Sequence, residues 1–113
     1  MKDIVWVGSS LDDVKGFPAQ VRHEIGFALY RAQLGSKHSN AKPLRGFGGG
    51  AVLEVVEDFD GDTYRAVYTV NLSNAVFVLH AFQKKSKQGR ETARRDMALI
   101  RSRLRWAEEL DAQ

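Results

Sequence analysis

Positively charged side chains gather at one place in the chain, directly after an apolar run. The run AVFVLHAF, residues 75–82, is followed by Lys84, Lys85 and Lys87 and then by Gly89. Residues 83–106 hold nine basic and two acidic residues, a net charge of +7, whereas residues 1–82 sum to −1. A basic cluster on a near-neutral body is typical of a protein that binds a polyanion such as nucleic acid. The alternative is a solvated helix face beside a strand end.

Arg65 lies inside the β-rich run TYRAVYTV. Strand alternation places Tyr64, Ala66 and Tyr68 on one face of the sheet and Arg65 on the other. Two roles for Arg65 remain open. Its guanidinium could pair with a carboxylate on a neighbouring strand, for which Glu54 is the candidate. It could instead bind a phosphate, which its planar fork of N–H donors suits.

Alternation in the stretch HAFQKK groups His80 with Lys84 and points Lys85 to the opposite face. Both lysines can serve one site only if the strand ends or bulges near Lys84. Otherwise they protect an exposed strand end. His80 is a candidate general acid or base, although a histidine on an apolar strand also fits a structural role.

The sequence lacks the motifs of metal, nucleotide-binding and hydrolase sites. The histidines at 23, 38 and 80 share no ligand spacing and the chain has no cysteine, so we expect no metal and no cofactor. P-loop, G-x-S-x-G and H-E-x-x-H motifs are absent. GFGGG, residues 46–50, lacks the Lys-Ser/Thr pair and the helix that follow a phosphate-binding loop, so we interpret it as a turn.

The composition predicts a single globular domain over residues 1–113. No apolar run reaches the roughly 18 residues that a membrane-spanning helix needs. The first residues, MKDIVWVGSS, do not resemble a signal peptide. We therefore expect a cytoplasmic protein without a membrane partner.

The elements that must position these residues follow from periodicity. Residues 4–7 predict a short strand, and residues 10–34 predict two helices separated by Gly16 and Pro18 and closed by Gly35. Residues 35–50 predict turns. The runs 51–58, 63–71 and 75–82 predict an antiparallel meander with Asp60-Gly61 as a hairpin turn, and the last run is apolar on both faces, as an internal strand is. A basic amphipathic helix follows from about Glu91.

The predicted order is therefore β-α-α-β-β-β-α. This order is typical of an α+β domain in which helices pack on a small, twisted, antiparallel sheet.

The sequence resembles the RelE/HigB superfamily of toxin–antitoxin ribonuclease toxins, in particular the phage-derived branch like gene product 49. The segments that carry the resemblance are PAQVRHEIGFALYRAQLG, KPLRGFGGGAVLEVVED, DTYRAVYTV and VFVLHAFQKKSKQG, followed by a basic helix. They occur in the family's order and cover nearly the whole chain. The resemblance implies a RelE-like fold and metal-independent cleavage of messenger RNA, usually on the ribosome.

The resemblance also implies roles for individual residues. It makes Arg65, Lys84 and Lys85 catalytic, and it matches Arg45 and Lys87 to less well-defined basic positions. We predict that the basic residues at the RNA surface are Arg45, Lys87, Arg90 and Arg94. His80 and Glu54 are the candidates for general acid or base. Some members carry a tyrosine or histidine near the C-terminus at the active site, whereas here the tyrosines are at 30, 64 and 68 and no histidine follows His80.

The partners implied are messenger RNA, the ribosome and a cognate antitoxin, which we expect to be a helix-turn-helix protein of the HigA or Xre type. Two alternatives remain. The same cationic surface could hold RNA or an acidic partner without turnover, or the basic helix could be a solvated face of a structural protein.

Overall fold

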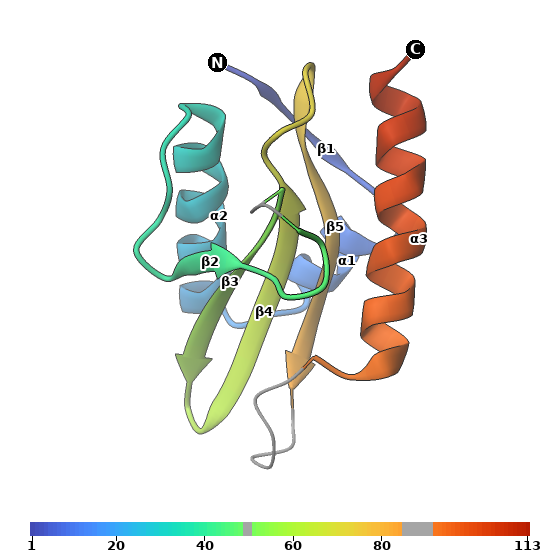
Figure 1. Cartoon of the computed structure of the whole chain (residues 1–113). Helices are drawn as coiled ribbons and strands as arrows, with labels where there is room; N and C mark the ends of the chain where they lie inside the picture. Colours follow the sequence, from blue (N-terminus) through green and yellow to red (C-terminus); the bar gives the residue numbers. More distant parts are fainter. Residues whose placement is uncertain (49–50, 85–91) are drawn as a thin grey trace.

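The computed structural model describes residues 1–48, 51–84 and 92–113. Figure 1 shows its elements in chain order: β1 (Asp3–Trp6), α1 (Ser10–Lys15), α2 (Ala19–Gln33), β2 (Ala41–Pro43), β3 (Val52–Phe59), β4 (Asp62–Thr69), β5 (Ala75–Lys84) and α3 (Arg94–Asp111). The α+β class is confirmed. In this part of the chain, no helix is long and apolar enough to cross a membrane.

The element order differs from the predicted one by the additional strand β2. This strand falls within residues 35–50, which we predicted as turns. It is three residues long and ends in Pro43, and it pairs only as the edge strand next to β3. A proline is tolerated at a sheet edge because its missing N–H is not needed there. So short a strand with a proline leaves no periodic signal in the sequence.

The sheet has the order β1-β5-β4-β3-β2. Three of its pairings are antiparallel, but β1 runs parallel to β5, with Asp3 opposite Ala75 and Trp6 opposite Val78. The prediction of a purely antiparallel sheet is therefore wrong. Short turns force their flanking strands to be antiparallel, whereas β1 and β5 are separated by most of the chain, so no local signal sets their relative direction.

The β3–β4 hairpin follows the sequence prediction. Its loop is Asp60-Gly61, with φ of 52° and 84°, and Phe59 pairs with Asp62 on either side. A two-residue loop with positive φ at both positions has the twist that adjacent strands require, and Asp-Gly is among its preferred sequences. The register of Arg65 against β3 is therefore determined by this turn.

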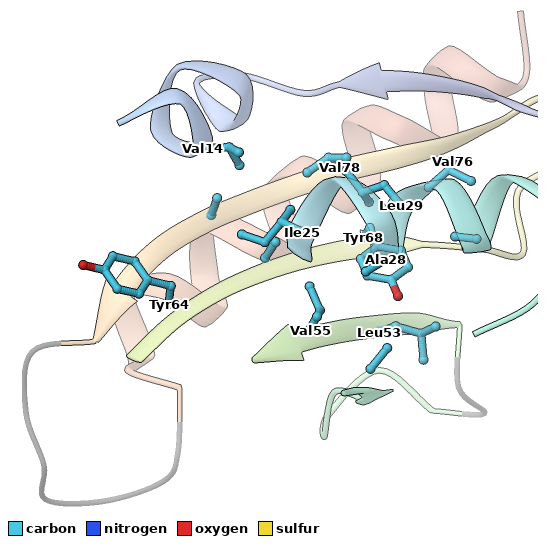
Figure 2. Packing of buried hydrophobic residues seen from close by; sticks show 14 of the residues in the cluster. Val14, Ile25, Ala28, Leu29, Leu53, Val55, Tyr64, Tyr68, Val76 and Val78 are labelled. Carbon is cyan, nitrogen blue, oxygen red and sulfur yellow. The ribbon is translucent and has the colours of Figure 1, made fainter. Parts of the chain in front are cut away.

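Helices cover both faces of the sheet. On one face, α2 places Val21, Ile25, Ala28, Leu29 and Ala32 against the strands. Figure 2 shows Ile25, Ala28 and Leu29 lying over the strands that carry Val55, Tyr68 and Val78. On the other face, α3 buries Ile100 and Ala107. Because β5 lies inside the sheet and carries residues of both clusters, its predicted internal position is confirmed.

A β-bulge in β5 sets the direction of its polar end. Val67 pairs with His80 and Tyr68 pairs with Val78, so Leu79 is an extra residue on β5. Two residues of β5 there oppose one residue of β4, and both Leu79 and His80 face α3. Without the bulge, the residues beyond it would point to the opposite faces, because a shift of one residue inverts strand alternation.

Arg103 of α3 forms a hydrogen bond to the backbone of the bulge. Its Nη1 donates a hydrogen bond to the carbonyl oxygen of Leu79 at 2.9 Å, and its Nη2 donates to Ser9 Oγ at 3.1 Å. The guanidinium lies against Gly8, which has a φ of 58°, and a Cβ at that position would be 2.7 Å from it. The positive φ favours glycine at position 8, and a Cβ there would displace the Arg103 guanidinium.

Candidate functional site

The face of the sheet toward α3 carries the polar residues that the sequence singled out. Arg65 pairs with Phe82 across β4 and β5, and Thr63 pairs with Lys84. Tyr64, Ala66 and Tyr68 belong to the opposite, α2-side cluster. The predicted separation of Arg65 from these residues is therefore confirmed, and Arg65, His80, Phe82 and Lys84 share one face of the sheet.

Arg65 forms a buried ion pair with Glu54 of β3. Its Nη1 donates to Glu54 Oε2 at 2.9 Å, and the two residues are 7% and 5% exposed. They are diagonal neighbours, because Glu54 is paired with Val67 and Arg65 with Val56. Charge-assisted hydrogen bonds of this kind are short and directional, so Glu54 orients the guanidinium. The pairing that the sequence left open is present.

The buried His80 forms a second pair, with the partly exposed Asp96 in the first turn of α3. The two atoms His80 Nε2 and Asp96 Oδ1 are 2.8 Å apart. The imidazole also stacks on Phe82, with the ring centroids 4.8 Å apart and the planes at 20°. In the neutral ring, Nε2–H donates to Asp96 and Nδ1 is the basic nitrogen. Nδ1 is buried, and no described residue hydrogen bonds to it.

Asp96 is the site residue that the sequence analysis did not identify. It lies 16 residues after His80, on a helix rather than the strand, and neither alternation nor helical periodicity relates two such positions. An acidic residue in the first turn of a helix is also common for a different reason, since it interacts favourably with the helix dipole. Only the packing of α3 on β5 brings the two side chains together.

Lys84 is half-buried at the described end of β5, opposite Thr63. Its regular pairing shows that the β5 bulge lies further back, at Leu79, and not at Lys84. Lys85, Lys87 and Arg90 lie outside the described residues. Whether the strand breaks after Lys84, as a shared role for both lysines requires, therefore stays a prediction.

Exposed basic residues border this face on the loop after β2 and on α3. Arg45 and Arg94 are exposed, as their predicted role requires. The loop that follows Arg45 packs against α3: the Arg101 guanidinium carbon is 5.4 Å from the Phe47 ring centroid, and a Cβ on Gly46 would be 3.2 Å from Arg101 Nη2. Arg101 is thus a further exposed cation, close to the loop that follows Arg45.

A group of possible metal ligands lies elsewhere, between α2, the loop before β2 and β3. The ligand atoms of Glu24, His38 and Glu57 are all within 4.8 Å of one another. However, the Asn40 backbone N–H donates to His38 Nδ1 at 3.0 Å, and His38 Nε2 is 3.3 Å from Glu24 Oε2. A neutral ring that accepts at Nδ1 carries its proton on Nε2, which is the atom that would face the metal. The cluster fits a structural link better than a metal site.

The fold and the site together define a class: a small α+β domain in which one face of a five-stranded sheet carries an Arg–Glu pair and a histidine that pairs with an aspartate of the helix packed on that face. The chain belongs to the family described as phage derived protein Gp49-like (DUF891), whose profile matches residues 12–105. This family is associated with toxins of toxin–antitoxin systems. No curated protein matches the chain significantly.

Proposed function

We propose that the protein is the toxin of a type II toxin–antitoxin system, with a RelE-like fold, and that it cleaves messenger RNA on the ribosome without a metal. The observation that carries this proposal is the Arg65–Glu54 pair on the α3 side of the sheet, in a chain of the Gp49-like family. Lys84 ends β5 on the same face, and Arg45, Arg94 and Arg101 are exposed around it. This arrangement suits a chain of phosphates rather than a single small anion.

The chemistry proposed uses the nucleophile that RNA itself provides. The 2′-oxygen attacks the adjacent phosphorus, and the bond from phosphorus to the 5′-oxygen breaks. The products are a 2′,3′-cyclic phosphate and a 5′-hydroxyl. One proton leaves the 2′-hydroxyl and one proton reaches the departing 5′-oxygen, so the step needs a base, an acid and charge stabilisation at the phosphorane.

In this proposal the half-buried Lys84 meets the scissile phosphate, together with Lys85. Arg65 lies deeper in the sheet, where it would stabilise the negative charge that develops on the phosphorane. A fixed cation in a low-dielectric setting interacts more strongly with such charge than a solvated one. Proton transfer falls to the lysine pair or to His80, whose orientation Asp96 fixes.

The proposed partners are messenger RNA and the ribosome, in the cytoplasm, and a helix-turn-helix antitoxin that neutralises the toxin. An antitoxin with acidic segments would be complementary to the basic border of the site. Reading the open reading frame beside this gene tests the antitoxin directly.

A second function is favoured by a specific observation. Two candidates for acid–base catalysis, Glu54 and His80, are buried, and their side chains contact Arg65 and Asp96. A module that binds RNA or a protein partner without turnover needs only the exposed cations. Steep salt dependence of binding is expected for either function, so affinity alone does not distinguish them.

Primer extension on messenger RNA after brief induction distinguishes the two functions. The wild type should produce new cuts, and the variant Arg65→Ala with Lys84→Ala should not. The matched control removes two positive charges elsewhere, from the exposed Lys15 and Lys37, and should cut like the wild type. The single variant Lys84→Ala removes a half-buried side chain and keeps the buried ion pair, so it separates lost chemistry from lost folding.

Cutting by the double variant at the wild-type rate would overturn the assignment of Arg65 and Lys84. If the wild type yields no cuts and no growth arrest but still binds ribosomes, the protein is the binding module instead.

A further inference from the structure

Helix α2 has two apolar sides, and only one of them is covered. Its inner side packs on the sheet. Its outer side is formed by exposed residues without a charged side chain at spacings of three, four and seven, which we call the outer ridge: Ala19, His23, Gly26, Phe27, Tyr30 and Leu34. Phe27, Tyr30 and Leu34 are 45%, 47% and 54% exposed. A surface helix normally carries its charged residues on the side away from the core.

Gly26 at the middle of the outer ridge points to close contact with another backbone. A Cβ added at Gly26 would meet no atom within 4 Å, so nothing inside the described structure requires glycine there. Glycine within a helix is less favourable than alanine, because a glycine residue loses more backbone conformational freedom when the chain folds. A notch at Gly26, between His23 and Tyr30 along the ridge, is useful where a second helix crosses α2 closely.

The charged residues beside the outer ridge indicate which kind of partner helix would be complementary to it. Arg22 and Lys37 are exposed, and the Arg31 guanidinium carbon is 5.7 Å from the Phe27 ring centroid. Glu24, the acidic residue of α2, is 3.3 Å from His38. A second copy of this chain that docked through its own outer ridge would bring the same excess of positive charge. An amphipathic helix with acidic residues beside its apolar stripe is complementary to these flanks.

The outer ridge ends at a hollow that extends the same surface. Leu34 lines this hollow of about 900 Å³ together with Met1, Pro43 and Leu53, and Lys2 and Lys37 border it. A hollow lined by apolar, polar and basic residues at the end of a helical ridge can receive one large apolar side chain of the bound helix.

We infer that the outer ridge of α2 is the docking surface for an acidic amphipathic helix of a partner protein. This surface lies on the face of the sheet opposite α3 and contains none of the residues of the candidate site. The inference therefore does not rest on the proposed nuclease function. A partner docked here binds the toxin-like domain at a distance from Arg65 and Lys84.

A peptide display experiment tests the inference, with a library of helical peptides that keep an apolar stripe and vary every other position. Selection on the full chain should enrich Asp and Glu beside the stripe. Binding of a selected peptide should weaken about tenfold or more in Gly26→Leu, which fills the notch, and in Phe27→Ser with Leu34→Ser. Because a Cβ at position 26 would meet no atom within 4 Å and the position is exposed, Gly26→Leu should keep its fold, which a thermal melt verifies.

Two controls give the experiment its specificity. Ala98→Leu adds the same side chain at an exposed position of α3 and should leave peptide binding unchanged. Arg94→Gln with Lys84→Ala should also leave peptide binding unchanged, because Lys84 belongs to the candidate site and Arg94 borders it. Peptides that bind Gly26→Leu as well as the wild type, or that show no excess of acidic residues, would overturn the inference.

Sedimentation of the chain alone tests whether a second copy of the chain binds the outer ridge. The wild type should be monomeric. A dimer that becomes monomeric in Gly26→Leu would show that a second copy occupies the outer ridge, and would overturn the assignment to an acidic partner helix.

Discussion

Arg103 of α3 and the carbonyl oxygen of Leu79 in β5 are joined by a hydrogen bond of 2.9 Å. Leu79 is the extra residue of the bulge, and His80 follows it directly. The same guanidinium bonds Ser9 in the β1–α1 connection. One side chain therefore ties together α3, the bulge and the start of α1, and it supports the strand segment that presents His80 to Asp96.

Replacing Arg103 by methionine should destabilise the protein by about 1.5 to 3 kcal/mol, the range for hydrogen bonds to a charged group. The change keeps most of the aliphatic packing but leaves the Leu79 carbonyl without its donor. Urea unfolding measures the loss. Arg105→Met on the exposed side of α3 is the matched control and should stay within about 0.5 kcal/mol of the wild type. Equal stability of the two variants would contradict the role given to Arg103.

The Arg65–Glu54 pair predicts a strongly non-additive mutant cycle. Arg65→Met or Glu54→Leu alone leaves one buried charge without its counter-ion and should cost about 3 to 5 kcal/mol. The double variant removes both charges and should recover most of that loss, because replacing a buried ion pair by apolar residues is often neutral. The free energy of unfolding of all four proteins gives the coupling. Additive losses would mean that the two residues do not act as a pair.

Tyr68 predicts a loss of stability at alkaline pH. Burial raises the pKa of its hydroxyl from 10.0 to about 12, and no described residue hydrogen bonds to it. The unfolded chain loses the phenolic proton first, so the stabilisation is complete below pH 10 and declines as the pH rises toward 12. A pKa difference of about two units between the folded and unfolded states corresponds to a change of about 2 to 3 kcal/mol in the free energy of unfolding.

Tyr68→Phe should remove that alkaline decline and leave stability at pH 7 nearly unchanged or slightly raised, because it deletes a buried hydroxyl without a described partner. Denaturant unfolding at several pH values between 8 and 12 makes the comparison. A decline that persists undiminished in Tyr68→Phe would assign it to another group.

Asp111 predicts a stability change at acidic pH. Its carboxylate accepts hydrogen bonds from the backbone N–H groups of Asn74 and Ser73, at 2.8 and 3.0 Å, and so ties the end of α3 to the β4–β5 turn. These bonds, that of Asn74 first, lower its pKa below 3.8. The stabilisation is therefore present above pH 3.8 and is lost as the pH falls through the lower pKa of the folded state.

Asp111→Asn should melt a few degrees below the wild type at neutral pH, and the difference should shrink as the pH falls below 3.8. Glu109→Gln, an exposed neutralisation in the same turn of α3, is the control and should show neither effect. A difference between Asp111→Asn and the wild type that stays constant down to pH 2 would contradict a charge-dependent contact.

The pair Arg65–Glu54 is a part of the site that short-range sequence signals determine. Alternation in β4 placed Arg65 on the face away from Tyr64 and Tyr68, and the Asp60-Gly61 turn set the register that brings Glu54 beside it. Both signals operate over a few residues. Pairing with Glu54 could therefore be predicted as one of two possible roles for Arg65. The α2 core positions, Val21, Ile25, Ala28, Leu29 and Ala32, recur at helical spacing, which is a signal of the same short range.

The pair His80–Asp96 shows what local signals miss. Its two residues come from a strand and from a helix whose packing depends on both hydrophobic clusters, and the bulge at Leu79 that orients His80 has no counterpart in the sequence pattern. The parallel pairing of β1 with β5 was missed for the same reason, since it joins segments separated by most of the chain.

By itself, the sequence determined the α+β class, the hairpin, the inner sides of the helices and the basic segment after residue 82, because turn chemistry, periodicity and charge act between near neighbours. Only the tertiary structure decided which charges are buried in pairs, which strand runs parallel, and that the outer ridge of α2 stays uncovered. These features depend on contacts between distant segments, and the free energy of such contacts comes from how complete elements pack.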